Sequence, residues 1–154
     1  ATIRIAELTG MAPTKIEAAE ISQAFSTGAV ESMITSPTTG KNSKIWENGV
    51  GYFYDIAAWF PKNMVIVNKD AWNKLDSATQ KLIMSEAAVA EKKGWELSKK
   101  GNVADKKALS DAGMKVGKVN SALEKHFQKV GATMADEWKA KAGSRGASVL
   151  AAYK

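Results

Sequence analysis

"SATQKLIMSEAAVAEKKGWELSKKGNVADKKALSDA", residues 77–112, is the longest stretch of helical sequence in this chain. No proline interrupts it, Asp76 or Ser77 can cap its first turn, and Gly113 stands where a helix-ending residue belongs. At a rise of about 1.5 Å per residue, the helix would be roughly 54 Å long. A compact domain of 154 residues is narrower than that, so the sequence predicts one very long helix that extends beyond a single core.

Small and apolar residues recur at spacings of three and four along this helix. The stripe consists of Ile83, Ala87, Ala90, Gly94, Leu97, Gly101, Ala104 and Ala108. A glycine inside a helix costs about 1 kcal/mol relative to alanine, so Gly94 and Gly101 need a compensating reason. Close packing is the ordinary reason, and we expect a neighbouring element to lie against this face.

Upstream of the long helix, the pattern changes to short alternating elements. Gly10 and the pair Thr27-Gly28 are placed to end two short helices, and Pro37 should end a strand because it cannot donate to a ladder. A strand–helix–strand unit with a crossover of about a dozen residues is long enough for a parallel pair. The predicted elements are a helix over 1–10, a strand over 13–16, a helix over 17–25 and a strand over 29–35.

The remaining segments complete the prediction of an α/β fold. Asn68 resembles the cap of a short helix, Asn120 or Ser121 the cap of a longer one, and Gly143 the stop of that helix. We expect a helical start near 41 that breaks around Asn48-Gly49, strand-rich segments at 51–60 and 63–68, a strand over 114–119, and helices over 120–143 and 147–154. The predicted architecture is a short mixed sheet packed by helices.

Composition restricts the class of protein. The chain is 45% hydrophobic and 25% charged, as soluble globular proteins are. No apolar run approaches the roughly 20 residues of a membrane-spanning helix, and the absence of cysteine excludes disulfides and thiolate metal sites. No charged-then-apolar leader begins at Ala1, so we expect that any targeting peptide was removed or never present.

The charge is concentrated in the second half. Residues 1–90 carry 8 Lys and Arg against 9 Asp and Glu, and residues 91–154 carry 14 against 7. A basic half can bind nucleic acid. The lysines, however, come in pairs such as Lys92-Lys93 among acidic and small residues, which favours a solvated helix face.

Two places suggest a ligand site. Thr35 and Ser36 follow the predicted strand over 29–35, and open α/β sheets bind ligands beyond the carboxyl ends of their strands. These hydroxyls can instead serve only the turn at Pro37. Trp59 can cover a ligand's carbon skeleton and offer its N–H, or can be an ordinary core tryptophan. Arg4 could pair with a carboxylate, but in the first turn of its helix it is more easily interpreted as a solvated charge.

No set of residues for catalysis emerges. His126 is the only histidine, no cysteine can join it, and no phosphate-binding glycine motif or G-x-S-x-G motif is present. Asp136 and Glu137 are adjacent on a helix, where side chains diverge. We therefore expect a protein that is not an enzyme and that has no cofactor and no metal site.

Two long segments resemble a known family. "RIAELTGMAPTKIEAAEISQAFSTGAVESMITSPTTG" (4–40) and "KIWENGVGYFYDIAAWFPKNMVIVNKDAWNKLDSATQKLI" (44–83) are similar to the solute-binding proteins of tripartite ATP-independent periplasmic (TRAP) transporters. The family's Thr-Gly-x-x-Asp element corresponds to 27–31, with Glu31 in place of the aspartate. Its W-x-x-L motif followed by glutamine corresponds to 72–75 and Gln80. The order and spacing of these elements make the resemblance specific.

The resemblance implies an extracytoplasmic, periplasmic receptor. Such a protein closes two lobes around a small organic acid and delivers it to membrane permease subunits. It implies ligand contacts by Thr35 and Ser36 after the strand, and by Trp59 and Asn63 in the segment that returns to the pocket. It also implies that the long helix spans both lobes.

Family members are about twice as long as this chain. The chain therefore resembles a C-terminal half, a periplasmic-binding-protein-like lobe lacking most of the other lobe and the family's carboxylate-pairing arginine. Its parts would be 1–36, the pocket and crossing segment 37–76, the long helix 77–112, and the strand and helices of 113–154. The alternatives are a basic helical nucleic-acid-binding module and a purely structural one.

Overall fold

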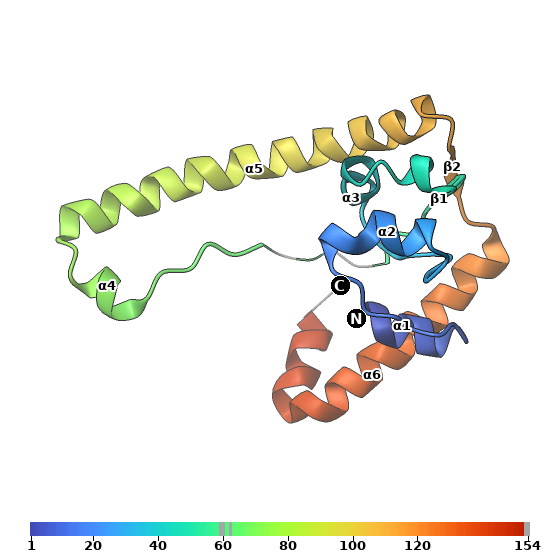
Figure 1. Cartoon of the computed structure of the whole chain (residues 1–154). Coiled ribbons are helices and arrows are strands. Elements are labelled where there is room, and N and C mark those ends of the chain that lie inside the picture. Colours follow the sequence, from blue (N-terminus) through green and yellow to red (C-terminus); the bar gives the residue numbers. More distant parts are fainter. Residues whose placement is uncertain (59–60, 62, 153–154) are drawn as a thin grey trace.

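The computed structural model describes residues 1–58, 61 and 63–152. The chain is mostly helical, with one small sheet (Figure 1). Its helices are α1 (Thr2–Leu8), α2 (Ile21–Ser26), α3 (Pro37–Asn42), α4 (Lys69–Asn73), α5 (Ser77–Asp111) and α6 (Ser121–Ala152), with 3-10 turns η1 (Ala18–Glu20) and η2 (Ile45–Asn48). The strands β1 (Tyr52–Asp55) and β2 (Lys115–Lys118) pair in parallel, with Tyr52 opposite Lys115.

The predicted long helix is confirmed as α5. Asp76 caps it by accepting the Thr79 N–H at 2.9 Å, and Gly113 ends it in the left-handed region at φ +93°. Figure 1 shows α5 projecting away from the other elements, which gather around its C-terminal end, while α4 lies at its far end. The length of the helix therefore follows from its own cap and stop, and its residues 81–100 are exposed within the described part of the chain.

The core lies where the last turns of α5 meet α3 and the sheet. Ile45, Leu109 and Met114 are its buried residues, and Leu109 is fully buried. A Cβ built on Gly40 would lie 3.6 Å from Leu109 Cδ2, at ordinary van der Waals distance, so α3 lies directly against α5 at this point. The core is completed by half-buried Ile21, Phe25, Met33, Trp46, Val50, Phe53 and Val116.

The helix ends follow local sequence as expected. Gly10 ends α1 at φ +77°, where the Met11 N–H donates to the Ala6 carbonyl at 2.8 Å, as in a Schellman motif. Gly143 interrupts α6 with φ +62° and ψ −147°, so the predicted stop is observed as a kink. Asn120 caps α6 by accepting the Leu123 N–H at 2.9 Å.

Three predicted strand segments are wrong for this chain. Residues 13–16, 29–35 and 63–68 form no strand, and the sheet has two parallel strands where a short mixed sheet was predicted. The strand predicted at 114–119 is confirmed as β2, and part of 51–60 as β1. A strand exists only when a neighbour takes its backbone hydrogen bonds. In the described part of the chain, no strand pairs with any of those three segments.

The surface is large for the size of the chain. Its accessible area is 12,027 Å², whereas a folded monomer of 16.5 kDa is expected to expose about 7,500 Å². Large apolar side chains that should be covered are exposed, among them Met64, Val65, Ile66, Leu82 and Trp95. The chain thus has the surface of a part rather than of a complete globule.

Candidate functional site

Four residues with side-chain hydroxyls, Thr35, Ser36, Thr38 and Thr39, lie at the start of helix α3. Ser36 is its N-cap, with its Oγ accepting the Thr39 N–H at 3.1 Å, and Pro37 occupies the first helical position, where its missing N–H costs nothing. Part of the hydroxyl row is therefore explained by helix capping. The Ser36 Oγ also lies 3.1 Å from Thr39 Oγ1, in a hydrogen bond that either hydroxyl can donate.

Helix α3 is held to α5 by a buried carboxylate. Asp105 is 6% exposed, accepts the Thr38 hydroxyl at 2.6 Å and pairs with Lys41 Nζ at 2.5 Å. These contacts lower the pKa of Asp105, the Lys41 hydrogen bond most and the Thr38 hydrogen bond next. The carboxylate thus stays ionised and fixes the start of α3, next to Thr35 and Ser36.

Thr35 and Ser36 line a hollow of about 640 Å³ beside the core. Its other walls come from the 28–34 segment, β1 and the core, including Phe25, Met33, Leu109 and Met114. Glu31 is the one charged residue among the described residues that line it. These described residues offer a ligand apolar contacts and hydroxyls.

A second hollow of about 650 Å³ adjoins the first, because Ile56, Val119 and Phe127 line both. Charged residues on its wall include Asp55 and Lys118. Asp55 accepts from Lys106 Nζ at 2.7 Å, which ties the end of β1 to α5.

The four predicted ligand residues are in different situations. Thr35 is half-buried and Ser36 exposed, and both reach the first hollow. Asn63 is exposed in the irregular segment before α4 and lines neither hollow. Trp59 lies outside the described residues. The structure therefore brings the two hydroxyls to one hollow, and ligand contact by all four residues stays a prediction.

Arg4, expected to be a solvated charge, has a side chain that is 41% exposed and that also forms ion pairs. Its Nε and Nη2 donate to Glu137 on α6, with the closest contact at 2.5 Å, and its Nη1 donates to Glu7 at 2.8 Å. These contacts raise the pKa of Arg4 and lower that of Glu137. The pair joins α1 to α6 and leaves the guanidinium engaged away from the hydroxyls.

Sequence reasoning missed both of these ion-pair clusters. Lys41 and Asp105 are 64 residues apart and Arg4 and Glu137 are 133 apart, so no local spacing relates them. The lysine pairs were interpreted correctly in part: Lys92 and Lys93 are exposed on α5. Lys106, by contrast, has a side chain that is only 25% exposed and pairs with Asp55 at 2.7 Å.

Neither a membrane-spanning helix nor a metal cluster is found in the described part of the chain. None of its helices is both long and apolar enough to cross a bilayer. Nowhere among residues 1–58, 61 and 63–152 do three His, Asp or Glu side chains gather at a possible metal site.

Solved structures match this chain closely. DctP6, a Bordetella pertussis extracytoplasmic solute receptor binding pyroglutamic acid, matches with a TM-score of 0.93 and 40% identity. The match covers 99% of this chain and 50% of the DctP6 chain. A marine metagenome TRAP solute binding protein in complex with co-purified pyroglutamate matches with a TM-score of 0.90 and 33% identity, over 99% of this chain and 50% of its own.

A third receptor gives the same result. DctP7 of Bordetella pertussis, which also binds pyroglutamic acid, matches with a TM-score of 0.91 and 37% identity, over 98% of this chain and 50% of its own. The chain therefore spans about half the length of the receptors it matches. None of the curated protein sequences matches it.

The family comparison agrees with the structures. The model of bacterial extracellular solute-binding proteins of family 7, named DctP, matches residues 1–141. That range includes both segments on which the resemblance to TRAP receptors was based, so the resemblance is confirmed. The match covers every described element up to α6 and most of α6 itself. The chain belongs to family 7 of the bacterial extracellular solute-binding proteins.

Proposed function

We propose that this chain is part of an extracytoplasmic receptor that binds a small organic acid and delivers it to the membrane permease of a TRAP transporter. The observation that carries the proposal is the match, along almost its whole length, to three receptors that bind pyroglutamate. Pyroglutamate, a cyclic amide with one carboxylate, is therefore the first ligand to test. The receptor would work outside the cytoplasm, in the periplasm.

The chain supplies one side of the proposed ligand cleft. Thr35 and Ser36 offer hydroxyl hydrogen bonds at the rim of an apolar hollow, which suits a small ring carrying polar atoms. A carboxylate removed from water needs a cation or several donors. Among the described residues that line the hollow, the charged one is the acid Glu31, and we infer that the remainder of a receptor of full family length supplies the cation.

Titration calorimetry tests whether this chain supplies the hydroxyls of the ligand site and the rest of the receptor supplies the cation. L-pyroglutamate should bind weakly to this chain and tightly to the full-length receptor that contains it. Equal affinities for the two proteins, or no binding by the full-length receptor to pyroglutamate or to other small organic acids, would contradict the proposal.

The role of the Thr35 and Ser36 hydroxyls is tested in the full-length receptor. Removing one hydrogen bond to a bound carboxylate costs about 1.5–3 kcal/mol, so Thr35→Val and Ser36→Ala should each weaken pyroglutamate binding by roughly tenfold or more. Ser26→Ala is the control, since the Ser26 hydroxyl donates within its own helix to the Gln23 carbonyl at 3.0 Å. An equal loss in all three variants would show that Thr35 and Ser36 act only through folding.

A further inference from the structure

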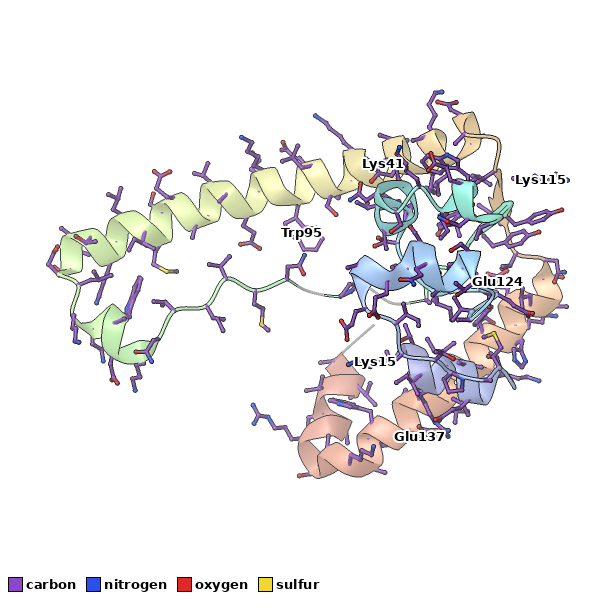
Figure 2. All side chains as sticks on the ribbon, viewed as in Figure 1. Lys15, Lys41, Trp95, Lys115, Glu124 and Glu137 are labelled. Carbon is purple, nitrogen blue, oxygen red and sulfur yellow. The ribbon has the colours of Figure 1, made fainter. Side chains whose placement is uncertain are left out.

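Asp105 is the buried charged residue among those that the structure describes, with an exposed fraction of 6%. Its carboxylate accepts the Thr38 hydroxyl at 2.6 Å and pairs with Lys41 Nζ at 2.5 Å. Figure 2 shows Lys41 where α3 meets α5. Within the described part of the chain, the walls of the two hollows include none of these three residues. The three residues therefore lie outside the hollow that Thr35 and Ser36 line.

Stability alone is a weak reason for a buried ion pair at this position. Taking a carboxylate and an ammonium group out of water is costly, and apolar residues of similar volume often stabilise a fold at least as well. A hydrogen-bonded ion pair differs from apolar packing because its bonds have preferred lengths and directions. The Asp105 contacts therefore contribute a defined orientation of α3 relative to α5, which apolar packing does not supply.

Helix α3 needs contacts with other elements to hold its orientation. It has 6 residues, and helices shorter than about 12 residues are marginal on their own. Gly40 lies against Leu109 at van der Waals distance, but apolar contact is non-directional and does not fix rotation about the helix axis. Thr38 and Lys41 are three residues apart and share one face of the helix. Their bonds to one carboxylate therefore fix which face of α3 meets α5.

The orientation of α3 also determines where its N-cap residue lies. Ser36 Oγ accepts the Thr39 N–H at 3.1 Å, and the Ser36 carbonyl accepts the Gly40 N–H at 3.2 Å. Ser36 is thus bonded to the same turn that Asp105 holds through Thr38, and Thr35 directly precedes Ser36 in the chain. A change in the orientation of α3 would therefore move both hydroxyls at the first hollow.

We propose that Asp105 is a positioning residue for the ligand site. Through Thr38 and Lys41 it holds the start of α3, so that Thr35 and Ser36 meet the bound organic acid in one arrangement. A site whose hydrogen-bonding groups are already oriented loses less conformational entropy on binding, and its affinity is higher for that reason. This inference rests on the proposed function and adds to it a residue that does not touch the ligand.

Titration calorimetry of the full-length receptor that contains this chain measures the effect. Asp105→Asn removes the charge that holds the Lys41 ammonium group, and it should weaken pyroglutamate binding by about threefold to thirtyfold. Glu137→Gln is the matched control, because it makes the same carboxylate-to-amide change in the ion pair with Arg4 that joins α1 to α6. The control should change the affinity by roughly twofold or less. Circular dichroism checks that each variant is folded at the temperature of the titration.

Two variants of Thr38 test the same role without removing the buried charge. Thr38→Val keeps the branched shape of the side chain and removes the hydroxyl that donates to Asp105, so it should weaken binding by about threefold to thirtyfold as well. Thr38→Ser keeps the hydroxyl and should bind pyroglutamate within roughly twofold of the wild type. A role in stability alone would leave the affinity of the folded receptor unchanged in both variants.

Three results would overturn the inference while the proposed function stands. The first is unchanged affinity in Thr38→Val and in Asp105→Asn, and the Thr38 pair alone decides if Asp105→Asn does not fold. The second is an equal loss of affinity in Asp105→Asn and Glu137→Gln. The third is an equal loss in Thr38→Val and Thr38→Ser, because the hydroxyl would then have no role. A wild-type receptor that binds no small organic acid would instead overturn the proposed function, and this inference with it.

Discussion

The two parts of α5 share one sequence pattern and differ in their surroundings. From 101 to 111 the helix is locked onto α3 by Leu109 and by the Asp105 hydrogen bonds to Thr38 and Lys41. From 81 to 100 every residue is exposed. The comparison shows that helix formation here follows from local sequence and capping, whereas burial depends on which neighbour the rest of the fold supplies.

The largest expected effect comes from replacing a leucine by alanine in the buried part of α5, compared with the same replacement in its exposed part. Leu109 is fully buried, so Leu109→Ala should lower the free energy of unfolding by about 2–5 kcal/mol. Leu97 is 58% exposed, and Leu97→Ala should change it by less than about 0.5 kcal/mol. Urea denaturation followed by circular dichroism measures both. Similar losses would mean that Leu97 is already covered.

A glycine substitution should give an effect of intermediate size and opposite sign. Gly94→Ala should raise the helix stability of this chain by about 1 kcal/mol, because an added Cβ meets nothing within 4 Å. Gly113→Ala is the contrasting variant. Its φ of +93° is strained for alanine, so it should be destabilising by roughly 1–2 kcal/mol. Thermal unfolding of the two variants checks both signs, and a destabilised Gly94→Ala would show that α5 is packed there.

The smallest expected effect is the change with pH in the free energy of unfolding that the Asp105–Lys41 ion pair contributes. Folding lowers the pKa of Asp105. The ionised Asp105 therefore stabilises the fold fully above its unfolded pKa of about 4. This stabilisation is lost as the pH falls through the pKa of Asp105 in the folded state. Between pH 7 and pH 3 the wild-type chain should therefore lose more stability than Asp105→Asn does.

Asp111→Asn serves as the control for that comparison. Asp111 pairs with Lys107 on the open surface, where the side chain is 61% exposed, and solvent screens such pairs strongly. Urea midpoints at pH 7, 5 and 3 should separate Asp105→Asn from wild type and leave Asp111→Asn close to it. Parallel curves for all three proteins would contradict the assigned role of Asp105.

Local chemistry made several elements predictable. Asp76, Gly113, Asn68 and Gly10 marked helix ends correctly, because caps and left-handed positions involve only neighbouring residues. Thr35 and Ser36 were predicted as polar groups at the end of a strand over 29–35; that strand does not form, and both residues line one hollow. Their role in ligand binding remains a proposal.

Long-range pairing was not predictable from the sequence. The strands expected over 13–16 and 29–35 have suitable residues, but the described chain brings them no partner. Arg4 was interpreted as a solvated charge, since nothing near it in sequence reveals Glu137. Likewise, the buried Asp105 is surrounded in sequence by lysines and alanines typical of an exposed helix.

The sequence by itself determined where helices begin and end, how long α5 is, and to which family the chain belongs, because these depend on local caps, glycine positions and ordered motifs. Only the tertiary structure decided which residues are covered. It placed α3 on one end of α5, paired β1 with β2, and left residues 81–100 of α5 and the segment 64–67 exposed. The physical reason is that burial and strand pairing need atoms from distant residues, which a one-dimensional pattern does not specify.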